Sequence, residues 1–100
     1  MTRTELEQRW LELTRVVLPS LAAERRWPVN ADHCFQRILL DAACGGRWYD
    51  SVSGRPAYRA IDVAKLADAV ELGGRVASGE ADLTALNAQS LRWRRERKSA

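Results

Sequence analysis

Apolar residues recur at intervals of three and four along most of this chain, and this spacing limits the fold more than any other feature of the sequence. Near the N-terminus the apolar positions are Leu6, Trp10, Leu13, Val17 and Leu21. Such spacing places these side chains on one face of an α-helix that ends at about Arg26. Pro19 disfavours a helical conformation at Leu18, so we expect a kink or a break there.

A second segment with the same periodicity follows the extended stretch that contains Pro28. We predict a helix from Ala31 to about Cys44, with Asn30 as its N-cap and Gly45 or Gly46 at its end. Its expected buried side chains are Cys34, Phe35, Ile38, Leu39 and Ala42.

Two more helices are predicted in the C-terminal half. The first is capped by Asp62 and stops at Gly79, and the second is capped by Asp82. Gly73 and Gly74 either mark a close helix contact or end the third helix early. The expected buried positions are Val63, Leu66, Ala67 and Val70, followed by Leu83, Leu86, Ser90 and Trp93.

These patterns predict an all-α fold, a small irregular four-helix bundle with one long loop at about residues 45–60. The 100 residues fit a single helical domain, and residues 92–100 form a basic extension of its last helix. No apolar stretch is long enough to span a membrane and no signal-peptide core is visible, so we expect a cytoplasmic protein. Cys34 and Cys44 would lie about 15 Å apart on one helix, too far for a disulfide.

The long loop combines the residue types that supply most binding energy at interfaces. We predict that it forms the main recognition surface together with the polar face of the second helix, with an anionic ligand as the first hypothesis. The predicted partner-binding residues are Arg47, Trp48, Tyr49, Asp50, Arg55, Tyr58 and Arg59 from the loop, and His33, Arg37 and Asp41 from the helix. The alternative is that Trp48 and Tyr58 plug the bundle and the arginines are solvated.

Positive charge is concentrated at the C-terminus. Residues 91–100 carry five basic side chains against Glu96, a local charge of +4, which leaves the preceding residues at −1 of the +3 total. The mixture of guanidinium groups with an aromatic ring suits nucleic-acid or acidic-partner contact. The predicted contact residues are Arg92, Trp93, Arg94, Arg95, Arg97 and Lys98. A solubilising tail with Trp93 in the core is the alternative.

Catalytic and metal-binding patterns are weak in this sequence. His33, Cys34 and Cys44 are too few and too scattered for a structural zinc site, so no metal is expected. Neighbours such as His33 and Cys34 do not face each other on a helix, which disfavours a Cys-His enzyme. His33, Arg37 and Asp41 line up on the polar face of the second helix as a solvated salt-bridge row, or as the wall of a site.

Three segments, WPVNADHCFQRILLDAACGGRWYD, RPAYRAID and LNAQSLRWR, resemble a group of short bacterial proteins associated with GNAT-type N-acetyltransferases. The resemblance covers residues 27–94 and implies acyl transfer from acetyl-CoA. Enzymes of that type hold acetyl-CoA with a strand and an RxxGxG/A loop. This chain has no such loop, so the resemblance assigns no catalytic residue.

Composition and motifs together favour a small non-enzymatic binding or regulatory module over an enzyme. We expect no cofactor, a protein or nucleic-acid partner, and a monomer or small homo-oligomer. An enzyme or enzyme subunit of acyl-transfer type is the alternative. A pocket with converging polar groups would favour the enzyme, whereas a flat positive face would favour nucleic acid.

Overall fold

The N-terminal part of the chain forms one long helix with a wider turn in its middle. In the computed structural model, which describes residues 1–96, α1 spans Arg3–Glu12, a π-helical segment spans Leu13–Val17 and α2 spans Leu18–Ala22. The Leu18 N–H donates to the Leu13 carbonyl and Leu18 keeps helical dihedral angles. The predicted irregularity is therefore a π-helical turn just before Pro19, and a full break at Leu18 is wrong.

This helix ends earlier than the sequence predicted. After Ala22 the chain turns, and Arg26 adopts a positive φ of 55°. The Trp27 N–H then donates to the Ala22 carbonyl at 3.0 Å, which closes the helix end. Glycine is the usual residue at such a left-handed position, so an arginine there gave no signal in the sequence.

The second predicted helix is α3, which spans Asp32–Cys44. Its N-cap is Ala31, which makes no side-chain cap hydrogen bond, so the prediction of Asn30 as the cap is wrong. The helix begins one residue later than expected, which puts Asn30 outside the capping position. The predicted end is confirmed, because Gly45 adopts a left-handed conformation with φ 71°.

The ends of the last two helices agree with their predicted caps. The Asp62 carboxylate accepts from the Ala64 N–H at the start of α5, Val63–Ser78, and Gly79 ends it with φ 90°. The Asp82 carboxylate accepts from the Ala85 N–H near the start of α6, Leu83–Glu96. These side chains satisfy N–H groups that have no partner within the helix.

Gly73 marks a close helix contact and does not end α5. A Cβ atom built there would lie 3.1 Å from Leu13 Cδ1 and 3.3 Å from Leu39 Cδ1. The absence of a side chain thus lets α5 approach both the π-helical segment and α3. Val63, predicted to be buried, is 46% exposed because it lies at the very start of the helix.

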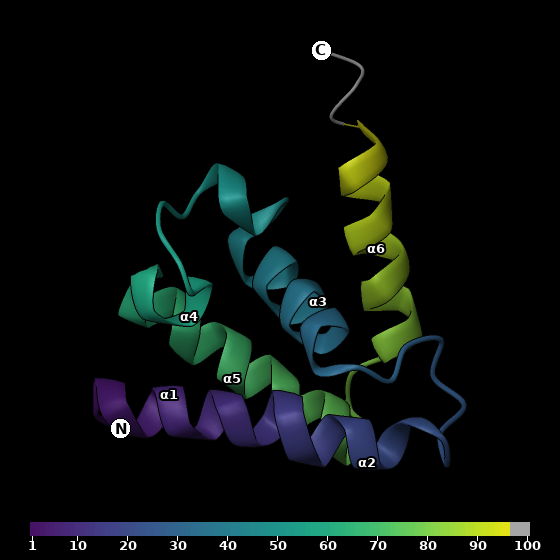
Figure 1. Cartoon of the computed structure of the whole chain (residues 1–100). Helices are drawn as coiled ribbons and strands as arrows, with labels where there is room; N and C mark the ends of the chain where they lie inside the picture. Colours follow the sequence, from purple (N-terminus) through teal and green to yellow (C-terminus); the bar gives the residue numbers. More distant parts are fainter. Residues whose placement is uncertain (97–100) are drawn as a thin grey trace.

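The helices form a small all-α fold, as predicted, with α3 at its centre (Figure 1). One face of α3 packs on α5 and another on α6, and α5 also packs on α1. Figure 1 shows α6 standing away from the layer of α1, α2 and α5. The buried apolar side chains are Leu6, Trp10, Leu13, Leu18, Ala22, Phe35, Ile38, Leu39, Leu40, Val52, Ile61, Leu66, Ala69, Val70, Val76 and Leu83.

The long connection between α3 and α5 contains two short helical pieces. Trp48–Asp50 forms a 3-10 turn and Ala57–Ala60 forms α4. No strand occurs in residues 1–96. Val52 and Ile61 anchor the loop in the core, with 9% and 2% of their surfaces exposed.

Two further observations on the described residues concern membrane-spanning helices and the state of the cysteines. Among residues 1–96, no helix has both the length and the apolar composition to cross a bilayer. Cys34 and Cys44 are free thiols, each partly buried.

Candidate functional site

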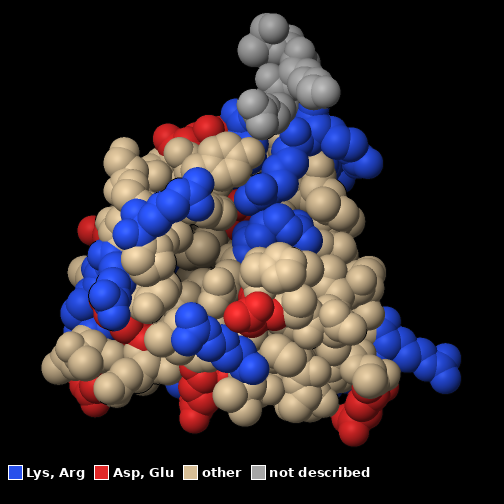
Figure 2. Space-filling model, in the orientation of Figure 1, with Lys and Arg blue, Asp and Glu red and all other residues tan. Residues whose placement is uncertain are grey.

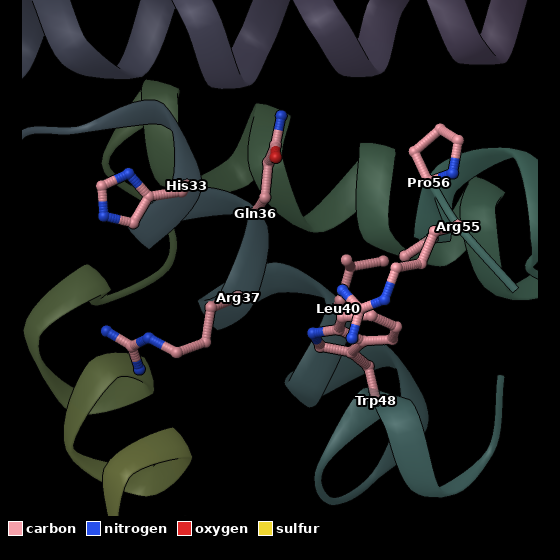
Figure 3. A pocket seen from close by; sticks show the side chains of 8 residues that line it. His33, Gln36, Arg37, Leu40, Trp48, Arg55 and Pro56 are labelled. Carbon is pink, nitrogen blue, oxygen red and sulfur yellow. The ribbon is translucent and has the colours of Figure 1, made fainter. Parts of the chain in front are cut away.

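A pocket lies between the N-terminal half of α3 and the loop that follows it. Its volume is about 550 Å³, within the range of ligand-binding pockets. Figure 3 shows side chains from α3 on one side and from the loop on the other. The lining residues are His33, Gln36, Arg37, Leu40, Trp48, Arg55, Pro56 and Ala57. The structure therefore brings together the two regions that the sequence predicted would form one surface.

The ionisable side chains that line this pocket are basic. Arg37, Arg55 and His33 line it, and none of its lining residues within the described chain is acidic. The Arg55 guanidinium lies 5.6 Å from the centre of the Trp48 ring, in cation–π geometry. Leu40, Trp48 and neighbouring loop residues supply apolar surface. An anion carrying a flat apolar group matches this lining.

Arg37 is held in place from α6. Its Nη1 donates to Ser90 Oγ and its Nη2 donates to Asn87 Oδ1, both at 2.7 Å. Figure 3 shows this side chain directed away from Trp48 and toward the helix in the colour of α6. A guanidinium that is already oriented loses less rotamer entropy when it meets a ligand.

Asp41 organises the contact among α3, α6 and the loop. Its carboxylate is fully buried and accepts from Arg94 Nε at 2.9 Å and Arg94 Nη2 at 3.0 Å. It also accepts from Ser90 Oγ at 2.6 Å and from the Trp48 N–H at 3.0 Å. The hydrogen bond from Arg94 to Asp41 is the main reason that the pKa of Arg94 is raised above its ordinary value.

This burial corrects the interpretation of the polar face of α3. A solvated row of His33, Arg37 and Asp41 is wrong for Asp41, because α6 covers this end of the face. Asp41 is therefore closed to direct contact with a partner, and its hydrogen bonds hold Arg94, Ser90 and the Trp48 backbone in place. The side chain of His33, in contrast, is 80% exposed at the other end of the row.

The other loop residues fall outside the pocket. Arg47 pairs with Asp50 at 2.7 Å, and its guanidinium lies 5.9 Å from the centre of the Tyr49 ring. Arg94 approaches the same ring at 5.2 Å. Arg47 and Asp50 also line a second hollow of about 210 Å³, which they share with Trp93, Glu96 and Gly46.

Tyr58 and Arg59 lie on the side of the loop that meets α1. Arg3 Nη2 donates to the carbonyl oxygens of both residues, at 3.0 Å and 2.9 Å. The Arg59 guanidinium lies 5.8 Å from the centre of the Tyr58 ring. Neither residue lines the pocket, so the predicted loop surface is divided among the pocket, the Tyr49 region and this α1 contact.

The predicted basic contact residues of α6 occupy different environments. Arg92 and Arg95 are exposed, Trp93 is partly buried, and Arg94 is bound to Asp41. Arg97 and Lys98 lie outside the described residues. Figure 2 shows basic side chains gathered near the end of α6 on this face of the molecule.

Four residues that line the pocket were not predicted from the sequence, namely Gln36, Leu40, Pro56 and Ala57. Gln36 and Leu40 follow the same helical face as His33 and Arg37, so the spacing of three and four could have identified them. The Gln36 amide donates to Thr14 Oγ1 in the π-helical segment at 3.1 Å. The wall of the pocket is therefore supported by the first helix.

Metal binding and similarity to known proteins give no further assignment. The described residues contain no group of three or more His, Cys, Asp or Glu side chains placed to hold a metal ion. Comparison with known proteins finds no matching family model, no matching curated protein and no matching solved structure.

Proposed function

We propose that this chain is a non-enzymatic binding module that captures an anionic protein or nucleic-acid partner in the pocket between α3 and the loop. One observation carries the proposal: among the described residues, the pocket is lined by Arg37, Arg55 and His33 and by no carboxylate, and of these three only His33 has a carboxylate, that of Asp32, within 4.0 Å. Arginine binds carboxylate and phosphate groups through paired, charge-assisted hydrogen bonds.

The two arginines would contribute in different ways. Arg37 is fixed by Asn87 and Ser90, so it presents its charge from a rigid wall. Arg55 is exposed and lies against the Trp48 ring, where it can turn toward an arriving anion. Apolar surface from Leu40 and Trp48 excludes water from one side of the ligand and strengthens these contacts.

The chemistry of the lining favours binding over catalysis. Covalent catalysis needs an activated nucleophilic side chain, most often a hydroxyl or thiol next to a base. Within the described residues the lining supplies His33 but no serine, threonine or cysteine. His33 is also largely exposed.

A matched pair of variants tests the proposal. Arg55→Ala removes a pocket charge, whereas Arg59→Ala removes the same charge from the same loop outside the pocket. The probes are hexaglutamate and an oligothymidylate of about 12 nucleotides, titrated at low salt by calorimetry. We expect at least one probe to bind, about tenfold more weakly to Arg55→Ala and unchanged to Arg59→Ala.

Two results would overturn the proposal. The first is that neither probe binds the parent, or that both variants bind like the parent. The second is release of free coenzyme A thiol from acetyl-CoA by the parent but not by a heat-denatured sample. That activity would favour the acyl-transfer alternative implied by the resemblance.

A further inference from the structure

The basic surface does not stop at the pocket. Figure 2 shows Lys and Arg side chains beside the hollow on this face and onward to the end of α6. Arg94 connects the two regions, because it reaches from α6 to Asp41 on α3. Arg95, the next residue on α6, is exposed, whereas Arg92 is exposed on roughly the opposite side of the helix from Arg94. A ligand longer than the pocket would therefore meet further positive charge.

Three acidic side chains near this surface lie beside basic partners: Asp41, Asp50, and Asp32, whose carboxylate lies 3.7 Å from His33 and 4.0 Å from Arg15. Arg94 neutralises Asp41, and Arg47 pairs with Asp50 at 2.7 Å. These pairs leave Arg55 and Arg37 as uncompensated cations at the pocket, because the partners of Arg37 are the neutral side chains of Asn87 and Ser90. The basic side chains of this surface therefore attract a ligand that carries several anionic groups in a row.

Aromatic rings are interleaved with these cations. The Trp48 and Tyr49 rings have centroids 5.7 Å apart and planes inclined by 75°. Arg55 lies over Trp48, and Arg94 lies 5.2 Å from the centre of Tyr49. Proteins that bind single strands without strict sequence preference combine basic grooves with rings on which bases stack.

From this arrangement we infer that the anionic partner is a single-stranded nucleic acid, an inference that rests on the proposed function. One base enters the pocket and stacks on Trp48 beside Arg55. Tyr49 offers a second ring to a neighbouring base. The phosphates follow the basic side chains from Arg37 toward Arg94 and Arg95 on α6.

The rings distinguish this partner from other polyanions. An acidic peptide would use the guanidinium groups but would gain little from two aromatic faces. A duplex keeps its bases stacked inside and offers chiefly phosphates to the surface, so it cannot place a base in the pocket. A single strand satisfies both the charges and the rings.

Affinity measurements on the whole chain separate these partners. A fluorescein-labelled oligothymidylate of about 12 nucleotides is compared by anisotropy with a duplex of equal length and with hexaglutamate. We expect the single strand to bind most tightly. Trp48→Leu keeps an apolar side chain without a π-face and should weaken its binding about tenfold. Circular dichroism checks that this variant is folded.

The contribution of α6 is measured through salt dependence. The variant Arg95→Ala should reduce the slope of log K against log salt by about 0.7 if this arginine neutralises one phosphate in the parent. Arg75 lies on α5 and lines neither pocket. The control variant Arg75→Ala therefore removes one positive charge and should leave this slope unchanged. Equal slopes in all three proteins would contradict the path along α6.

Photocrosslinking tests the stacking of bases on Trp48 and Tyr49 without any substitution. An oligothymidylate that carries one 4-thiothymidine should crosslink to Trp48 or Tyr49. Crosslinks restricted to α6, or a duplex that binds as tightly as the single strand, would overturn the inference. If hexaglutamate binds in the pocket and the oligonucleotide does not, the inference fails and the proposed function stands. If neither binds, both fail.

Discussion

Asp41 and Arg94 are joined by two hydrogen bonds across the contact between α3 and α6, at 2.9 Å and 3.0 Å. The Asp41 side chain is fully buried, whereas 27% of the Arg94 side chain is exposed. Ser90 and the Trp48 N–H donate to the same carboxylate. One buried charge thus links α3, α6 and the first turn of the loop, and the shape of the pocket depends on this link.

Asp41 and Arg94 are buried to different extents, so replacing each of them should lower the free energy of unfolding by a different amount. Arg94→Ala leaves a buried carboxylate without its counter-charge, and we expect a loss of about 3 kcal/mol in the free energy of unfolding. Asp41→Asn leaves Arg94 able to turn toward water, so this variant should lose less. Urea denaturation of both variants measures the difference.

Arg92→Ala is the matched control for this prediction. Arg92 lies on the same helix and is exposed, so its removal should change stability by less than about 0.5 kcal/mol. If Arg94→Ala were no more destabilising than Arg92→Ala, the Asp41–Arg94 pair would contribute nothing to the α3–α6 contact.

The adjacent glycines of α5 predict opposite responses to the same substitution. A Cβ at Gly74 meets nothing within 4 Å, so Gly74→Ala should raise the free energy of unfolding by about 0.5–1 kcal/mol through better helix propensity. A Cβ at Gly73 meets two leucine methyl groups in the packed core, and overpacking there costs about 1–3 kcal/mol.

Thermal and urea unfolding of the two glycine variants provide the comparison. We expect Gly73→Ala to be less stable than Gly74→Ala by about 1 kcal/mol or more. Equal stability would mean that Leu13 and Leu39 move aside without cost, and that α5 does not need a glycine at this contact.

Helix ends were predictable because they depend on local chemistry. Asp62 and Asp82 accept backbone N–H groups within three residues, and Gly45 and Gly79 adopt left-handed conformations that glycine tolerates. Where the local chemistry is atypical, prediction failed. Arg26 adopts a positive φ without being glycine, so the end of the first helix was misplaced.

The environment of Asp41 could not be predicted from its own helix. Its spacing from Arg37 is typical of an exposed salt-bridge row, and only the packing of α6 turns that face inward. The complementary signal lies 53 residues away in Arg94. Ser90 and Arg94 are four residues apart on α6, as Arg37 and Asp41 are on α3, but the sequence does not say which helices pair.

The pocket was predicted in outline and not in detail. The loop and the polar face of α3 do meet, and His33, Arg37, Trp48 and Arg55 line one pocket. Tyr58 and Arg59 are absent from it because the loop enters α4 and turns toward α1, where Arg3 binds their carbonyl groups. Tertiary packing decided which side of the loop each aromatic residue occupies.

The Cys44 thiol predicts how stability responds to alkaline pH. Burial raises its pKa above the ordinary value; Lys65 opposes this shift and Asp41 adds to it. Below the ordinary thiol pKa of about 8.5, the folded and unfolded states both hold the proton. As the pH rises through that value, the unfolded state releases its proton first. The free energy of unfolding therefore falls until the raised folded-state pKa is passed.

Cys44→Ser isolates this contribution, because all other titrating groups, including Cys34, are common to both proteins. Between about pH 8 and pH 10, the parent should lose stability more steeply than the variant. The same raised pKa should make Cys44 react more slowly with iodoacetamide at about pH 8 than a free cysteine peptide does, since the thiolate is the reactive form. Parallel stability curves and equal alkylation rates would show that α3 does not shield this thiol.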